Sequence, residues 1–89
     1  MNKEERKKWL LEEISGVVSH PSGPDFEVTM TRWHWHTLDW ITKEIGLPLR
    51  QVIEGVLEAD EGDGFQETLK GYIEYFEYAY DKGAGRPAW

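Results

Sequence analysis

The sequence lacks cysteine altogether, so its 89 residues offer no disulfide framework and no thiolate for catalysis or metal binding. Apolar residues never follow one another for more than two or three positions, which excludes a membrane-spanning helix. The opening residues, MNKEERKKW, also lack the apolar core of a signal peptide. These absences fit a cytoplasmic protein that does not enter a membrane.

Cations are scarce relative to acids. Lys and Arg number 10 against 17 Asp and Glu, which gives a formal net charge of −7. A surface of this sign repels nucleic-acid phosphates and anionic lipid headgroups at long range, and it suits a cationic protein partner. The sequence also contains no nucleophile–base pair, no cluster of metal ligands and no glycine-rich phosphate loop. We therefore expect a protein that is not an enzyme and that needs no cofactor or metal.

One acidic stretch, Glu58–Gly64, is rich in glycine and resembles the start of a calcium-binding loop. The two positions that would need acidic ligands at the ends of such a loop are occupied by Ala59 and Lys70. The stretch therefore predicts an ordinary turn, in which Asp63 caps the following helix and Gln66 closes the capping box.

Tryptophan is abundant, and much of it gathers in one stretch, Phe26–Ile45. This stretch begins with alternation, because Phe26, Val28 and Met30 are apolar and the residues between them are polar. A period of two predicts a short strand with one apolar face. Thr31 then suits a helix N-cap, and beyond it the apolar period changes to that of a helix.

The helix that follows carries two apolar stripes. Trp35, Leu38 and Ile41 fall on one side, whereas Trp33 and Trp40 are seven positions apart and point roughly the opposite way. A helix of this kind has to be covered on both sides, and a single layer packed against it is not enough.

Two histidines belong to the same helix. His34 and His36 diverge by about 200° around its axis, so they cannot share a metal ion as an i, i+4 pair can. His34 falls near the centre of the side that carries Trp35, and we expect it in the core or in a dimer interface.

The strand needs a partner, because its backbone N–H and C=O groups cannot remain unpaired. No second strand of similar quality is evident, since Val17 and Val18 form too short a run at the end of a helical pattern. A second copy of the chain could supply the partner, which would give an intermolecular two-stranded ribbon with two-fold symmetry. The dimer interface expected from this arrangement consists of Phe26, Val28, Met30, Trp35, Leu38, Val52, Ile53 and Val56.

The residues before this strand are expected to be mainly helical. Asn2 followed by Glu5 is typical of a capping box, and apolar residues at helical spacing continue to about Val18. We expect this helix to cover Trp33 and Trp40. The predicted organisation is an N-terminal amphipathic helix at 1–19, a linker at 20–25, a strand–helix unit at 26–81 and a flexible tail at 82–89.

Two further helices follow the tryptophan helix. Gly46 suits the residue that ends it, and Pro48 suits the first position of the next helix. The apolar residues of Leu49–Leu57 recur at helical spacing, with Gly55 in their midst as a point where another element could approach closely. The last helix is expected over Phe65–Asp81.

The order of these elements resembles that of the ribbon-helix-helix superfamily, and it is most similar to a bacterial and phage subfamily with an extended middle section. The similar segments are Val28–Thr31, Trp35–Ile41, Gly46–Ile53 and Leu69–Phe76, so that the resemblance covers roughly residues 26–80. It implies a mainly α fold with one short β-strand, arranged as a ribbon-helix-helix-like homodimer with an extra N-terminal helix.

In that superfamily the paired strands enter the major groove of DNA, so the resemblance implies that Glu27 and Thr29 would contact bases. Glu27 adds negative charge at this edge, and Pro48 has no N–H group to offer a phosphate. The cations that remain for phosphate contacts are Arg32, Arg50 and the N-terminal group of Lys3, Arg6, Lys7 and Lys8.

We therefore expect a non-enzymatic, dimeric and acidic binding module on a ribbon-helix-helix scaffold. Its partner would be another protein, as for an adaptor or for an inhibitor of the kind that phages encode. The alternative is a DNA-binding transcriptional regulator that uses the strand pair and the basic N-terminal arm.

Overall fold

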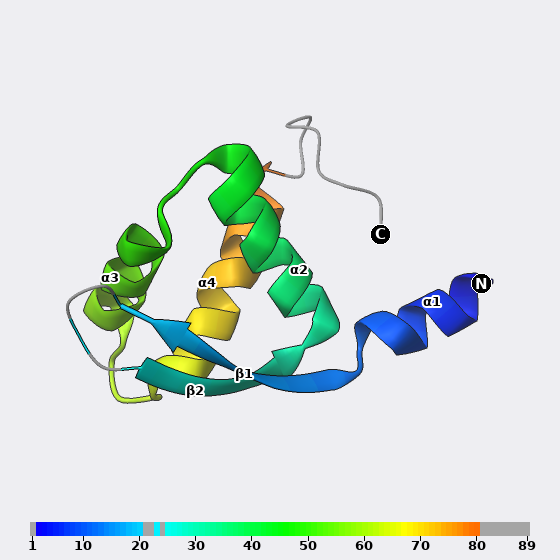
Figure 1. The fold of residues 1–89 in the computed structure, drawn as a ribbon, viewed down its shortest axis with the longest axis horizontal. Helices are drawn as coiled ribbons and strands as arrows, with labels where there is room; N and C mark the ends of the chain where they lie inside the picture. Colours follow the sequence, from blue (N-terminus) through cyan, green and yellow to red (C-terminus); the bar gives the residue numbers. More distant parts are fainter. Residues whose placement is uncertain (1, 21–22, 24, 81–89) are drawn as a thin grey trace.

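The computed structural model describes residues 2–20, 23 and 25–80. It is mainly helical, with one antiparallel two-stranded sheet. α4 packs against β2, α2 and α3, while α1 lies at the periphery of the molecule and contacts α2 (Figure 1). In chain order the elements are α1 (Lys3–Leu10), β1 (Glu13–Ser19), β2 (Asp25–Thr31), α2 (Arg32–Trp40), the short π-helix η1 (Ile41–Ile45), α3 (Leu49–Ala59) and α4 (Phe65–Tyr80).

The helix expected over residues 1–19 is wrong beyond Leu10, where the chain turns into strand β1. The physical reason is that the same apolar residues also fit a period of two. Ile14 and Val18 lie on the covered face of the sheet together with Gly16, and the residues between them are exposed. The β-branched residues favour a strand here, and Gly16 disfavours a helix.

β2 finds its partner within the same chain, so the expectation of an intermolecular ribbon through this strand is wrong. β1 and β2 are antiparallel, with Ser15 opposite Thr29 and Gly16 opposite Val28. Trp35 holds β1 in place, since its indole Nε1 donates a hydrogen bond of 2.8 Å to the carbonyl oxygen of Ile14.

The apolar core lies where the hairpin meets the helices. The first stripe of the tryptophan helix is covered, as predicted, because Leu38 and Ile41 are buried; on the second stripe Trp40 is buried and Trp33 only partly so. The buried apolar residues are Val18, Val28, Met30, Leu38, Trp40, Ile41, Val52, Ile53, Val56, Leu69 and Ile73.

Several predicted helix ends are confirmed. The Thr31 side chain accepts a hydrogen bond from the N–H of His34 at the start of α2, and Gly46 ends η1 with a φ of +83°. Pro48 stands one position before α3 instead of opening it. The close approach expected at Gly55 is made by the Tyr72 side chain, whose hydroxyl would lie 3.0 Å from a Cβ placed there.

No helix in the described part of the chain combines the length and the apolar character that a bilayer crossing requires. The predicted tail at 82–89 lies outside the described residues.

Candidate functional site

None of the residues of α1 is buried, so aromatic and polar contacts hold this helix against the rest of the chain. The Arg32 guanidinium of α2 lies 4.4 Å from the Trp9 ring centroid and donates a hydrogen bond of 3.0 Å to the Trp9 carbonyl oxygen. It also pairs with Glu12 at 3.1 Å. The Trp9 ring meets His36 edge-on, with 5.4 Å between the centroids. These contacts set α1 beside α2 without extending the core.

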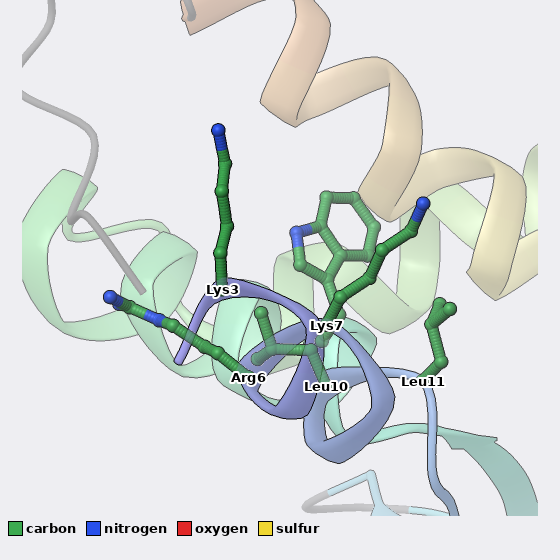
Figure 2. Close-up of a pocket in the computed structure, with 6 residues that line it drawn as sticks. Lys3, Arg6, Lys7, Leu10 and Leu11 are labelled. Carbon is green, nitrogen blue, oxygen red and sulfur yellow. The ribbon is translucent and has the colours of Figure 1, made fainter. Parts of the chain in front are cut away.

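An open groove of about 320 Å³ lies between α1 and α2. Its apolar part comes from Leu10, from Leu11 and from Trp33 of α2. Leu11 is 56% exposed, so this apolar surface is in contact with solvent. Cations follow the i, i+3, i+4 spacing of one helix face beside it. The lining residues are Lys3, Arg6, Lys7, Leu10, Leu11 and Trp33, and Figure 2 shows Lys3 and Lys7 extending to the same side of α1.

The charge beside this groove is opposite to that of the remaining chain. Residues 2–11 carry four Lys and Arg against two Glu, whereas residues 12–89 carry six Lys and Arg against fifteen Asp and Glu. Lys3 and Lys7 form no ion pair with any described residue. The helix dipole favours Lys7 in the last turn of α1, but it disfavours Lys3 in the first. The position of Lys3 is therefore unexplained by the fold itself.

The residues of the DNA-binding interpretation are partly engaged in other contacts. Glu27 is exposed on the outer face of the hairpin opposite Val17. The Thr29 hydroxyl lies 2.8 Å from that of Ser15, and the Thr29 N–H donates to Oε1 of Gln66 over 2.9 Å. The capping-box role predicted for Gln66 is therefore wrong, because its side chain closes the outer edge of β2.

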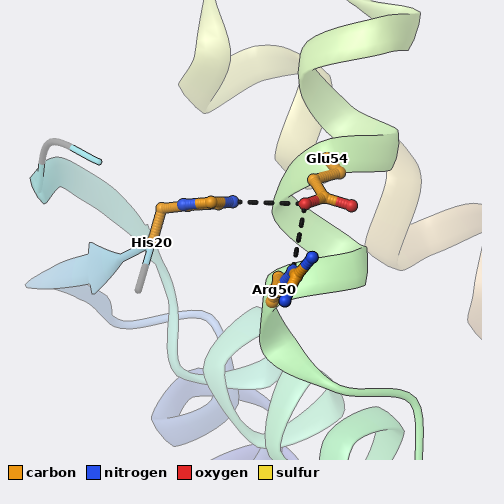
Figure 3. Close-up of polar contacts among 3 residues, drawn as sticks. All are labelled: His20, Arg50 and Glu54. Carbon is orange, nitrogen blue, oxygen red and sulfur yellow. Dashed lines mark hydrogen bonds and ion pairs between the residues drawn. The ribbon is translucent and has the colours of Figure 1, made fainter. Parts of the chain in front are cut away.

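Arg50, the other cation of that interpretation, pairs with Glu54 on α3 at 3.2 Å. His20, at the end of the hairpin, approaches the same carboxylate oxygen at 3.4 Å (Figure 3). The Arg50 hydrogen bond, followed by that of His20, holds the pKa of Glu54 below its ordinary value. This trio ties the hairpin to α3, which gives Arg50 a structural role.

The residues predicted for a dimer interface serve the core of a single chain. Six of them are buried in it, and the other two, Phe26 and Trp35, pack at its margin. The Phe26 ring stacks on that of Phe65 with 4.0 Å between the centroids. These side chains therefore have partners in their own chain. The six are Val28, Met30, Leu38, Val52, Ile53 and Val56.

His34 is a core residue, as predicted, with 7% of its surface exposed. Its Nδ1 lies 2.7 Å from the Thr31 hydroxyl, which also accepts the His34 N–H. Which of these two atoms donates depends on the tautomer of the ring. Nε2 has no hydrogen-bond partner among the described residues, because Glu74 remains 3.9 Å away. Burial lowers the pKa of His34, while the Glu74 carboxylate partly opposes this shift.

The sequence predicts Asp63 as the cap of the following helix, but the hydrogen bonds of the acidic turn before α4 converge on Asp60. Its Oδ1 accepts the N–H groups of Gly62 at 2.9 Å and Gly64 at 3.2 Å. These two hydrogen bonds lower the pKa of Asp60. Within the described residues no group of three or more His, Asp and Glu side chains is placed to hold a metal ion.

Sequence reasoning missed Leu11 and Trp33 as groove residues. The sequence places Trp33 beneath one long N-terminal helix, whereas α1 ends early and leaves both residues lining an open groove. The cluster of Lys3, Arg6 and Lys7 was the available signal, because it stands out in an acidic chain. Comparison with protein-family models, characterised proteins and solved structures gave no match.

Proposed function

We propose that this chain is a non-enzymatic binding module that docks an acidic segment of a partner protein in the groove between α1 and Trp33. The observation that carries the proposal is the pair Lys3 and Lys7. Both ammonium groups stand without an ion pair in the described structure, beside an exposed apolar surface, in a chain with a net charge of −7.

The chemistry of the groove indicates what would fill it. Its cations would pair with carboxylates, and its apolar part would accept an apolar side chain such as leucine. Small interfaces obtain most of their affinity from one or two apolar anchors, with charges at the rim that set specificity. An amphipathic segment with both Glu and Leu meets these requirements.

A protein segment fits the groove better than duplex DNA does. Phosphates call for many cations, and two of the predicted ones, Arg32 and Arg50, already pair with Glu12 and Glu54. The sheet face that would approach bases carries Glu27. The order of β2, α2 and α3 supports a strand–helix–helix scaffold, used here without its DNA-reading surface.

Fluorescence anisotropy with three labelled probes tests the proposal. The probes are a 14-residue peptide of Glu and Leu at amphipathic spacing, the same peptide with Lys in place of Glu, and a 20-base-pair duplex. We expect the Glu/Leu peptide to bind with a dissociation constant on the order of 10 µM and to weaken with salt. Stronger binding of the duplex would favour the DNA-binding alternative, and binding of none of the probes would contradict the proposal.

Two matched pairs of variants locate the site. Lys7→Glu should weaken peptide binding by about fivefold, whereas Lys8→Glu, on the same helix but outside the groove, should not. Leu11→Ser should weaken it further, whereas Leu57→Ser on α3, a leucine of similar exposure at 47%, should not. Equal effects within either pair would contradict the assignment of the groove.

A further inference from the structure

The two-stranded sheet has one closed edge and one open edge. On β2 the outward N–H of Thr29 is taken by Gln66, and α4 packs against this strand. The backbone N–H and C=O groups of Thr29 point away from β1. Its cross-strand partner Ser15 therefore points the same groups away from β2, and the residues two positions away along each strand have the same orientation. No described residue hydrogen-bonds these outward groups of β1.

The open edge lacks the usual protection against pairing. Edge strands are normally blocked by proline, by inward-pointing or lysine charges, or by a bulge. β1 has no proline and a regular register, and its single charge stands at one end, at Glu13. In its middle the side chain of Val17 is 60% exposed, so the strand also presents an apolar side chain beside its open edge.

We propose that β1 pairs with β1 of a second copy of this chain, in an antiparallel register centred on Gly16. This surface is separate from the α1 groove, so the inference does not depend on the proposed function. The result would be a four-stranded sheet with a two-fold axis, in which each open edge closes the other. Such an isologous contact ends at a dimer and leaves no exposed edge of β1 for further growth.

The register follows from self-complementarity. Centring on Gly16 places Ser15 opposite Val17 of the second copy and Glu13 opposite Ser19 of the second copy, so that no two like charges face each other. Each outward backbone N–H and C=O group from Glu13 to Ser19 is then paired with the second copy, which gives about eight backbone hydrogen bonds. The two exposed Val17 side chains become diagonal neighbours on one face of the sheet.

Sedimentation equilibrium on the intact chain, from about 10 µM to 1 mM, measures the association, since an interface this small is expected to be weak. The average mass should rise from 10.4 kDa towards twice that value as concentration increases. A mass that stays at 10.4 kDa throughout would overturn the inference.

Charge substitutions at Ser19 test the register. Ser19→Glu places like charges opposite Glu13 twice in each dimer and should weaken association by about fivefold, whereas Ser19→Lys should strengthen it by a similar factor. Adding Glu13→Lys to Ser19→Glu should restore association. Because Ser19 also faces Asp25 within the chain, circular dichroism is recorded for each variant to confirm that the hairpin remains folded. Equal dimerisation of the two single variants would overturn this register.

An isotope-filtered NOE experiment on a mixture of labelled and unlabelled chains gives an independent result. In this register the two Gly16 Cα atoms lie about 4.5 Å apart, as in a non-hydrogen-bonded antiparallel pair, and an interchain contact between their Hα protons should appear. Interchain contacts from residues of other elements, without this one, would overturn the inference.

Discussion

The indole of Trp35 lies directly on Gly16: a Cβ placed on that glycine would stand 2.9 Å from two carbons of the ring. The same indole is hydrogen-bonded to the Ile14 carbonyl oxygen. A glycine is thus needed at position 16 because the ring leaves no room for a Cβ, and not because of the backbone angles of Gly16. We predict that Gly16→Ala destabilises the fold by about 1–3 kcal/mol, because the ring has to move. Urea unfolding followed by tryptophan fluorescence measures this change.

Gly71 provides the matched control. It lies on the exposed side of α4, and nothing stands within 4 Å of a Cβ placed there. Gly71→Ala should therefore stabilise the protein by about 0.5–1 kcal/mol through helix propensity alone. If the two glycine variants change stability equally, the contact between Gly16 and Trp35 is not what the structure shows.

This contact also explains why the hairpin was hard to foresee. The strand signal of β2 is clear in the sequence, because Phe26, Val28 and Met30 alternate with polar residues. The corresponding residues of β1 include a glycine in place of an apolar side chain, and the apolar surface that would complete the pattern is supplied by Trp35 from α2. Because Trp35 belongs to a different element, far from Gly16 in the sequence, its contribution cannot be seen in the local pattern of β1.

Two threonines of α2 and its cap should respond in opposite ways to substitution by valine. Thr31 caps the helix and contacts His34 Nδ1, so Thr31→Val should cost about 1 kcal/mol. The Thr37 hydroxyl is fully buried and has no hydrogen-bond partner among the described residues. Thr37→Val, which keeps the shape and removes the orphan hydroxyl, should be neutral or stabilising. Thermal unfolding of both variants measures the difference, and a large loss in Thr37→Val would reveal a partner for that hydroxyl.

Stability should fall in mildly acidic solution because of His34. Burial lowers the pKa of this histidine in the folded chain below its ordinary value of 6.5. The unfolded chain therefore takes up a proton first as the pH falls. The stability contribution of the neutral ring is complete above about pH 6.5 and is lost as the pH decreases towards the folded-state pKa. Unfolding free energies measured at pH 7.5, 6.5 and 5.5 test this dependence, for which we expect little change between pH 7.5 and 6.5 and a clear decrease between pH 6.5 and 5.5.

Two variants test the role of His34 in this pH dependence. His34→Phe should show a weaker pH dependence than the wild type over the same range, whatever its absolute stability. Glu74→Gln removes the carboxylate that opposes the effect of burial, so an NMR titration of this variant should place the pKa of His34 lower still. A rise of that pKa in Glu74→Gln would contradict the assigned cause.

The candidate site was only partly accessible from the sequence. The sequence identifies the cations of residues 3–8 as candidates for phosphate contacts, but the apolar surface beside them depends on where α1 ends. That end is set by the turn at Leu11 and Glu12, which the hydrogen bonds of Arg32 from α2 stabilise. The short helix is what exposes Leu11, and no periodic pattern predicts such a long-range contact.

The indole N–H signals of Trp33 and Trp35 provide the most direct measurement of the central claim, which is that the α1 groove binds an acidic, apolar-anchored segment. Both signals would be assigned in a ¹⁵N-correlated NMR spectrum and followed while the Glu/Leu peptide is added. The account predicts that the Trp33 signal and the amides of α1 shift together, while the Trp35 signal, whose N–H is bound to Ile14, stays in place. Shifts confined to Trp35 and the hairpin, or the absence of any shift at millimolar peptide, would contradict it.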